Sequence, residues 1–192
     1  MSMNTEKLLQ EIVDRQGPLG NARMAHEHES AMTSDAVAGL IVRPTTVSLI
    51  TIFNGESPGG KSLVMDRLFG FNLVTTAAQT MFSLWYCNHT ELLNVAKPAN
   101  DIITLRGTGD GREPDLGTVR VEVDGTVVDD GWFPCGNWGE GEEVGILPGA
   151  AVEWECRGRI VVRPKAALSL SIVAGTTGQT FTVGASWWRT QV

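Results

Sequence analysis

The sequence predicts an all-β protein, an antiparallel β-sandwich of the jelly-roll type that follows a short N-terminal helix and an arm. From Leu40 onward, apolar and polar residues alternate with a period of two, which is typical of strands that bury one face. Clusters rich in Gly, Pro, Asn and Asp separate these runs, and no helical period lies between them. A parallel sheet needs a crossover helix after nearly every strand, so these observations exclude a parallel α/β fold.

Eight or nine strands are expected in this part of the chain. The expected strands cover residues 45–53, 62–71, 80–87, 101–106, 119–123, 126–128, 152–156, 168–172 and 181–187. The run at 119–123 ends at Asp124-Gly125, a dipeptide that favours a tight turn. Residues 126–128 are therefore predicted to return as the second strand of a hairpin.

The N-terminal region has a different pattern. Residues 5–16 carry four apolar side chains on one face of a predicted amphipathic helix of about three turns. These four are Leu8, Leu9, Ile12 and Val13. Residues 17–36 are small and polar without a period, which is typical of a linker or arm. So short a helix is not stable alone in water and needs a partner surface. We therefore expect a helix and attachment arm over residues 1–37 and the sandwich domain over residues 38–192.

The composition excludes several classes of partner. The chain carries 15 Lys and Arg against 22 Asp and Glu, a net charge of −7, so nucleic acid is not an expected partner. No run of about 18 apolar residues is present, so we expect no membrane span. The first residues lack the apolar stretch of a signal peptide, so synthesis in a cytosol is expected. Cys87, Cys135 and Cys156 are an odd number in that reducing compartment and are predicted to be free thiols.

Residues 55–62, GESPGGKS, match the phosphate-binding pattern G-x-x-x-x-G-K-[ST] at every position, and an apolar strand precedes them. In that interpretation Lys61 would neutralise phosphate charge and Ser62 would hold Mg²⁺. The pattern requires a helix that begins at the lysine, but Gly70 and the run 71–76 favour a strand. A hairpin-type loop is therefore the first prediction, and a small nucleotide-binding enzyme that uses Lys61 is the third hypothesis for function.

The other motifs give little support for metal binding or catalysis. Residues 26–29, HEHE, resemble a fragment of a metal site, but they supply too few ligands, and a solvated arm segment is expected instead. No nucleophile elbow of the type G-x-S-x-G is present. Acidic pairs such as Glu142-Glu143 lie in Gly-rich turns, which favours exposed loops over a catalytic dyad. We therefore expect no enzyme and assign no catalytic, cofactor-binding or metal-binding residue.

Four of the six tryptophans are candidates for an interface. Neighbouring strand residues point to opposite faces, so Trp187 and Trp188 cannot both enter one core. One of them must face a second layer, a subunit or a ligand, and a subunit contact is the first choice because aromatic residues are common interface anchors. Trp132 and Trp138 lie in or beside turns with Asp, Asn and Glu nearby, an arrangement that also suits sugar stacking.

Residues 52–71, which include residues 55–62 (the lysine segment), and residues 167–188 resemble parts of the jelly-roll head-decoration or minor capsid proteins of tailed bacteriophages. The first stretch is similar to that family's strand, Gly-rich "NPAGSGKNLVL"-like loop and strand. The second is similar to its closing pair of strands, which are rich in Ser, Thr and Ala and end in an aromatic residue. The resemblance explains the lysine segment without a nucleotide and transfers no catalytic residue.

The resemblance implies a symmetric oligomer, with a trimer favoured, that binds other virion proteins such as the major capsid protein. The leading hypothesis is therefore a non-enzymatic virion structural protein, made in the host cytoplasm, that self-associates and docks on a capsid or tail lattice. The runner-up is a carbohydrate- or receptor-binding jelly-roll module, such as a spike or fibre head that binds a host surface glycan.

Overall fold

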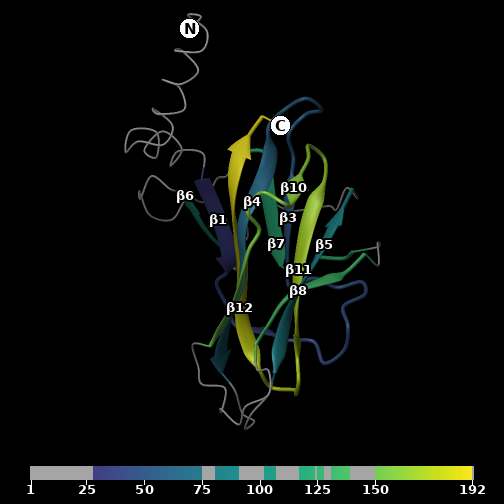
Figure 1. The fold of residues 1–192 in the computed structure, drawn as a ribbon, viewed down its shortest axis with the longest axis vertical. Coiled ribbons are helices and arrows are strands. Elements are labelled where there is room, and N and C mark those ends of the chain that lie inside the picture. The colour runs from purple at the N-terminus through teal and green to yellow at the C-terminus, as the bar shows by residue number, and fades with distance from the viewer. Residues whose placement is uncertain are drawn as a thin grey trace, which may run out of the picture.

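The computed structural model describes residues 28–74, 81–90, 102–106, 117–123, 125–127, 131–138 and 150–191. Within these residues every regular element is a β-strand, and the strands form two antiparallel sheets (Figure 1). The predicted all-β antiparallel sandwich is thus confirmed. The helix predicted for residues 5–16, with its stripe Leu8, Leu9, Ile12 and Val13, lies outside the described residues. Nowhere in the described ranges is there a helix with the length and hydrophobicity needed to span a bilayer.

Two sheets divide the strands between them. Sheet A comprises β1 (His28–Thr33), β2 (Val37–Ala38), β4 (Ser62–Val74), β6 (Ile102–Arg106), β9 (Ala151–Glu155), β10 (Val161–Val162) and β12 (Thr180–Thr190). Its strand order is β10-β4-β12-β1-β6, with β9 also paired to β4 and β2 also paired to β12. Sheet B comprises β3 (Ile50–Asn54), β5 (Phe82–His89), β7 (Val119–Val123), β8 (Phe133–Trp138) and β11 (Ala167–Ala174). Its strand order is β7-β3-β11-β5-β8.

The strand pairs are nested along the chain. β1 pairs with β12, β3 with β11, β4 with β9, and β5 with β8, and every one of these pairs is antiparallel. The β1 and β4 pairs belong to sheet A and the β3 and β5 pairs to sheet B, so the chain crosses repeatedly between the sheets. β6 and β7 lie between β5 and β8 in the sequence and extend the two sheets at their edges. Strands from distant parts of the chain therefore meet at the centre of each sheet.

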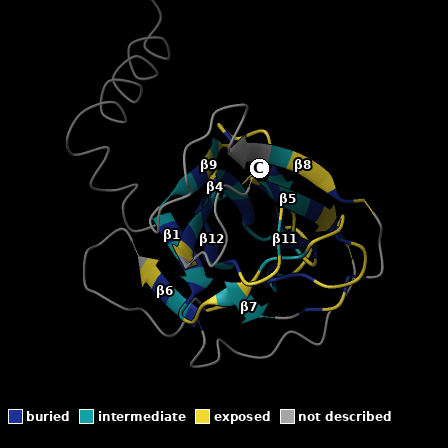
Figure 2. Cartoon of the chain, turned by 90° about the horizontal axis from the view of Figure 1, so that it is seen from below, coloured by how far each residue is buried: buried dark blue, intermediate teal, exposed yellow. Residues whose placement is uncertain are grey.

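The core lies between the sheets and is built from the inward positions of each strand. Ile50 and Ile52 on β3 and Leu168 on β11 are completely buried, and burial of each such side chain contributes about 1.5–3 kcal/mol. Gly70 on β4 packs closely against sheet B, since a Cβ there would be 2.4 Å from Cδ1 of Ile172 on β11. Figure 2 shows buried residues gathered in the middle and exposed residues on the edge strands β6 and β8.

The outer face of sheet B is covered by other parts of the same chain. Trp132 and Val127 pack against Cys87 of β5, and all three side chains are buried. Nε1 of Trp132 donates to the carbonyl oxygen of Thr45 at 2.9 Å. This hydrogen bond ties Trp132 to the segment that leads into β3. Sheet B is therefore buried on both of its faces near the middle.

Buried polar residues cross sheet B beneath this cover. The Thr51 hydroxyl oxygen lies 2.7 Å from the hydroxyl oxygens of both Ser48 and Ser169, and that of Ser169 lies 3.0 Å from Nε2 of His89. Ser48 also donates to the carbonyl oxygen of Gly125 at 3.0 Å. Serines that alternate with Leu and Ile are typical of a solvated strand face, yet Ser169 is fully buried. These hydrogen bonds are why a polar row can line a buried face.

The hairpin predicted at Asp124-Gly125 is wrong. β7 runs antiparallel to β3 with Val123 opposite Ile50, and three residues further along both strands Thr126 lies opposite Val47. Both pairs belong to one register, so the chain continues beside the segment that precedes β3 instead of turning back along β7. Backbone hydrogen bonds on either side of the Thr126 bridge extend this ladder, and a return strand would give them up.

The structure also corrects the predicted boundary between arm and sandwich at residue 38. β1, which the sequence assigned to the arm, lies inside sheet A between β12 and β6. Its inward-facing residues are Glu29, Ala31 and Thr33, and all three are buried. Because these residues are small or polar, the strand lacks the alternation by which a core strand is recognised. The sandwich therefore includes residues from at least His28 onward.

Candidate functional site

The lysine segment connects the two sheets. β3 ends at Asn54 in sheet B and β4 begins at Ser62 in sheet A, so the segment is a crossing rather than the predicted hairpin. The Asn54 side chain donates to the carbonyl oxygens of Lys61 and Val162, each at 3.0 Å, and so fixes the crossing against β10. The strand predicted after the lysine is confirmed, since β4 runs for 13 residues. The segment is thus not followed by the helix whose N-terminus would bind phosphate in a loop of this pattern.

Trp187 and Trp188 face opposite sides of sheet A, as predicted. Trp187 is fully buried in the core, where its Nε1 donates to Oε2 of Glu29 at 2.9 Å. Trp188 is half-buried on the outer face, and its ring centroid lies 4.4 Å from that of His28. Of this pair, Trp188 is therefore the residue that presents surface to a partner.

The other two interface candidates differ in what the structure describes. Trp132 is 4% exposed and packs on Cys87, so contacts within the chain account for its apolar surface. Trp138 ends β8 opposite Phe82, and its side chain lies outside the described residues. The four predicted aromatic anchors therefore do not come together at one site in the described part of the chain.

The outer face of sheet A carries a groove of about 390 Å³. Its apolar floor comes from β1, β4 and β6, with side chains that are half-buried or, for Leu105, 42% exposed. These apolar side chains are Met32, Phe69, Phe71, Ile103 and Leu105. Sheet B buries its corresponding face under Trp132, whereas the described part of the chain leaves this face of sheet A open. An open apolar patch with a polar rim is typical of a protein interface.

Polar side chains occupy the end of the groove, and a β-bulge places them there. Between β4 and β12 the register shifts by one residue at Asp66, so Asp66 and Arg67 both line the groove. Oδ2 of Asp66 accepts a hydrogen bond from Oγ of Ser186 at 3.4 Å and lies 3.5 Å from Nε2 of His28. Arg67 pairs with Glu153 at 3.1 Å. The groove thus combines an apolar floor with charges of both signs at one end.

Gly184 on β12 lies against Phe69, one of the side chains that form the floor of the groove. A Cβ at this position would lie 2.4 Å from the carbonyl oxygen of Ala31 and 2.6 Å from Cζ of Phe69, closer than real Cβ contacts allow. Glycine is therefore required here for the aromatic ring to lie across β12. A larger residue would push Phe69 outward and fill the groove.

A buried ion pair lies at the inner side of the same sheet. Both carboxylate oxygens of Glu29 accept from Nη2 of Arg189 at 2.9 Å, and the indole of Trp187 adds a third hydrogen bond. Nη1 of Arg189 lies 3.9 Å from Oε1 of Glu56 in the lysine segment. The sequence interpretation missed this pair because it treated Glu29 as part of a solvated arm. The sequence did hold one signal: on a strand, His28 and Glu29 must face opposite sides, so one of them must face the core.

The three cysteines are free thiols in the structure. Burial raises the pKa of Cys135 to about 12, and the neighbouring Cys156 adds to this increase. Burial also raises the pKa of Cys156 to about 12, with a further contribution from the Asp66 carboxylate. Both thiols are therefore protonated and weakly nucleophilic near neutral pH. Among the described residues, no group of three His, Cys, Asp or Glu side chains is arranged to hold a metal ion.

The groove on sheet A is thus the part of the described surface whose geometry best suits a protein partner. No protein-family model matches the chain, and no curated protein matches it. A functional assignment therefore depends on strand pairing, on the surface chemistry and on the sequence resemblance.

Proposed function

We propose that this protein is a non-enzymatic structural protein of a virion, a jelly roll that self-associates and docks on a capsid or tail lattice. The nested pairing of eight strands, first with last and so on inward, supports a jelly-roll topology, which is a double sheet made of two Greek keys. In this topology β6 and β7 are additions at the sheet edges. Jelly rolls include viral capsid and lectin domains, so the fold alone leaves both classes open.

The observation that carries the virion proposal is the position of the two stretches that resemble the phage family. The first covers the end of β3 and most of β4, and the second covers β11 and most of β12. Although the stretches are far apart in the sequence, β3 pairs with β11 in sheet B and β4 pairs with β12 in sheet A. The resemblance therefore falls on one contiguous, two-layer unit at the centre of the sandwich. Such a unit is what a shared fold would retain, whereas two chance matches need not be neighbours.

The open groove of sheet A supports self-association. Its five apolar side chains share one face, and Leu105 on the edge strand β6 is 42% exposed. We assign this face to a second copy of the chain, because the resemblance implies a symmetric oligomer. The N-terminal stripe would then be available to dock on the lattice.

A carbohydrate- or receptor-binding module is the second candidate. It depended on Trp132 and Trp138 as exposed rings beside acidic residues, and the burial of Trp132 removes one member of that pair. The third candidate, a nucleotide-binding enzyme, depended on a helix after Lys61, where β4 begins instead. Both observations favour the virion proposal over its rivals.

Light scattering on the purified full chain tests self-association. We expect a stable trimer, with three times the 20.7 kDa mass of the chain. Leu105→Glu places a charge in the groove and should yield folded monomers. Met81→Glu is the matched control, because Met81 is 58% exposed, lies just before β5 of sheet B and is not part of the groove, and this variant should remain a trimer. A monomeric full chain, or an oligomer that Leu105→Glu leaves intact, would contradict the assignment of this face.

The virion location is tested on purified virus particles. Mass spectrometry should detect peptides of this chain in a fixed ratio to the major capsid protein. Deletion of residues 1–27 should prevent incorporation while leaving the oligomer intact, because the proposal assigns lattice docking to the arm. Detection of the chain only outside particles would contradict the proposal.

A further inference from the structure

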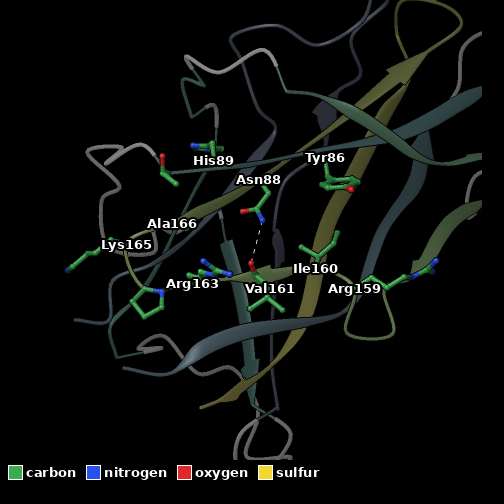
Figure 3. A pocket seen from close by; sticks show the side chains of 11 residues that line it. Tyr86, Asn88, His89, Arg159, Ile160, Val161, Arg163, Lys165 and Ala166 are labelled. Carbon is green, nitrogen blue, oxygen red and sulfur yellow. Dashed lines mark hydrogen bonds between the residues drawn. The ribbon is translucent and has the colours of Figure 1, made fainter. Parts of the chain in front are cut away.

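A cleft of about 730 Å³ opens at one edge of the sandwich, away from the groove on sheet A. It lies between the end of β5 in sheet B and the short strand β10 of sheet A with its flanking turns (Figure 3). This volume falls within the range of pockets that bind small organic molecules, about 300–1,000 Å³. The cleft is therefore large enough for a ligand of one or a few rings.

Apolar and hydrogen-bonding side chains form the walls of the cleft. Along β5 the inward positions change from Phe82 and Leu84, which are buried in the core, to Tyr86 and Asn88, which line the cleft. Nδ2 of Asn88 donates to the carbonyl oxygen of Val161 at 3.4 Å, across the gap between the sheets. Burial raises the pKa of Tyr86, so its hydroxyl remains a donor at neutral pH. Together these groups suit a ligand with an apolar ring and hydroxyl substituents.

The rim of the cleft is cationic, although the whole chain carries a net charge of −7. Residues 157–165 contain four of the 15 Lys and Arg and no Asp or Glu. Three of these four, Arg159, Arg163 and Lys165, line the cleft. No acidic side chain is among the described residues that line it. The cleft is therefore a local concentration of positive charge on an acidic protein.

The three cations are not neutralised by carboxylates within the described part of the chain. Arg159 donates to the carbonyl oxygens of Cys156 and Glu155, at 3.1 and 3.2 Å, and lies 5.2 Å from the ring centroid of Trp154. Lys165 donates to the carbonyl oxygen of Gly55 at 2.9 Å. The exposed guanidinium of Arg163 makes no hydrogen bond or ion pair to a described residue.

Three arginines outside the cleft pair with carboxylates. Arg157, in the same segment but outside the cleft, pairs with Glu155 at 3.1 Å. Arg67 and Arg189 also pair with carboxylates. The cationic side chains in the cleft thus keep charge to offer a ligand, whereas Arg157, Arg67 and Arg189 are neutralised by carboxylates.

The backbone of this segment adopts an uncommon conformation at both ends. Arg157 and Lys165, with φ of 50° and 65°, are the two non-glycine residues at positive φ among the described residues. Non-glycine residues rarely adopt a positive φ, and residues held in this conformation cluster at ligand-binding sites. At Lys165 the conformation places the charged residue at the rim of the cleft, just before β11.

We propose that this cleft binds an acidic saccharide, with its carboxylate or sulfate group on Arg163 and Lys165 and its ring against Tyr86 and Ile160. A guanidinium presents paired N–H donors that match the geometry of an oxyanion, and such charge-assisted hydrogen bonds are the strong ones. The sugar hydroxyls would bond to Asn88 and Tyr86. This site goes beyond the virion role and shares no residue with the groove on sheet A, so each assignment can fail without the other.

Calorimetric titration of the full chain at low ionic strength tests the proposal. The probes are sialyllactose and sulfated N-acetylglucosamine, compared with lactose, N-acetylglucosamine and inorganic sulfate. We expect saturable binding of at least one acidic sugar and much weaker binding of its neutral counterpart and of inorganic sulfate. Arg163→Gln should raise the Kd of the acidic sugar about tenfold or more, because it removes a charge-assisted hydrogen bond. Lys165→Asn should act in the same direction, since Asn tolerates positive φ.

Arg157→Gln is the matched control, because it removes the same side chain and charge from the same segment outside the cleft. It should change the Kd less than twofold, and each variant should keep the Tm of the parent chain. Equal losses in Arg157→Gln and Arg163→Gln would attribute binding to general charge and overturn the site. Absence of saturable binding of both acidic sugars, or binding of inorganic sulfate with equal affinity, would overturn the saccharide assignment.

Discussion

Substitution of alanine for Glu29 should destabilise the sandwich strongly, because this carboxylate is 3% exposed and accepts hydrogen bonds from Trp187 and Arg189. The alanine would leave the buried indole N–H without an acceptor and the guanidinium of Arg189 without its counter-charge. The sequence pattern assigned residues 17–36 to a solvated arm, where the same substitution would have no effect. The experiment therefore distinguishes a core strand from an arm.

The magnitude follows from the burial of the pair. An unsatisfied buried donor costs about 1–3 kcal/mol, and removal of one partner from a buried ion pair costs about 3–5 kcal/mol. Arg189 retains 15% exposure and lies 3.9 Å from Glu56, so water and this second carboxylate recover part of the loss. We expect the free energy of unfolding to fall by about 3 kcal/mol. Since the free energy of unfolding of a domain is about 5–15 kcal/mol, this decrease is a large fraction of it.

Equilibrium unfolding in urea, followed by circular dichroism, measures the change. The matched control is Glu153→Ala, which removes the same side chain from its pair with Arg67 at 3.1 Å. That pair is 45% and 42% exposed, so its loss should cost about 0–1 kcal/mol. If Glu29→Ala and Glu153→Ala lower the free energy of unfolding equally, β1 does not depend on this pair and the reasoning is refuted.

A double variant provides a second check on the same reasoning. Glu29→Met combined with Arg189→Met removes both charges and fills the space with apolar atoms. Replacement of a whole buried ion pair in this way is often neutral or stabilising. The double variant should therefore be more stable than Glu29→Ala, and a still larger loss would show that the two side chains act independently.

The remaining predictions concern the thiols, the lysine segment and the N-terminus. The pKa values of Cys135 and Cys156 are raised from 9.0 to about 12, so the thiol contribution to stability is complete below pH 9.0 and is lost as the pH rises through about 12. Substitution of either cysteine by Ala should flatten this alkaline loss in urea titrations, and an unchanged slope would contradict it. Millimolar ATP or GTP with Mg²⁺ should leave the Tm unchanged, whereas tight binding that Lys61→Ala abolishes would overturn the loop assignment. Deletion of residues 1–27 should leave the free energy of unfolding nearly unchanged, whereas deletion of residues 1–36 should unfold the chain because it removes β1.

Alternation in the sequence predicted the strands whose inward positions are large and apolar. The predicted runs coincide closely with β4, β5, β9, β11 and β12. The alternation did not predict β1, because Glu29 faces inward there and is stabilised by Arg189, a partner 160 residues away. β8 was also missed, since Pro134 and Gly136 are typical of turns, although proline is tolerated on an edge strand such as this one. Local pattern therefore fails where a distant partner or an edge position decides the structure.

The candidate sites were less predictable than the strands. The period of two predicted that Trp187 and Trp188 would face opposite sides, but not which would be buried. That choice depends on the register with β4, where Trp187 lies opposite Met65 and a bulge follows at Asp66. The groove and the cleft each combine residues from several strands, so their composition follows from the topology and not from any local motif.

The nested pairing has a consequence for the order of folding. β1, near the start of the described chain, can complete its main pairing only after β12 has been synthesised, since the pairs run from His28 with Trp188 to Met32 with Gly184. Sequence-distant contacts of this kind slow folding, and all-β domains dominated by them fold in milliseconds to seconds. Until then β3 and β4 lack β11 and β12, so apolar strand edges stay exposed on the ribosome. Production of this protein at high level should therefore be limited by aggregation of nascent chains, and slower synthesis at low temperature should increase the soluble yield.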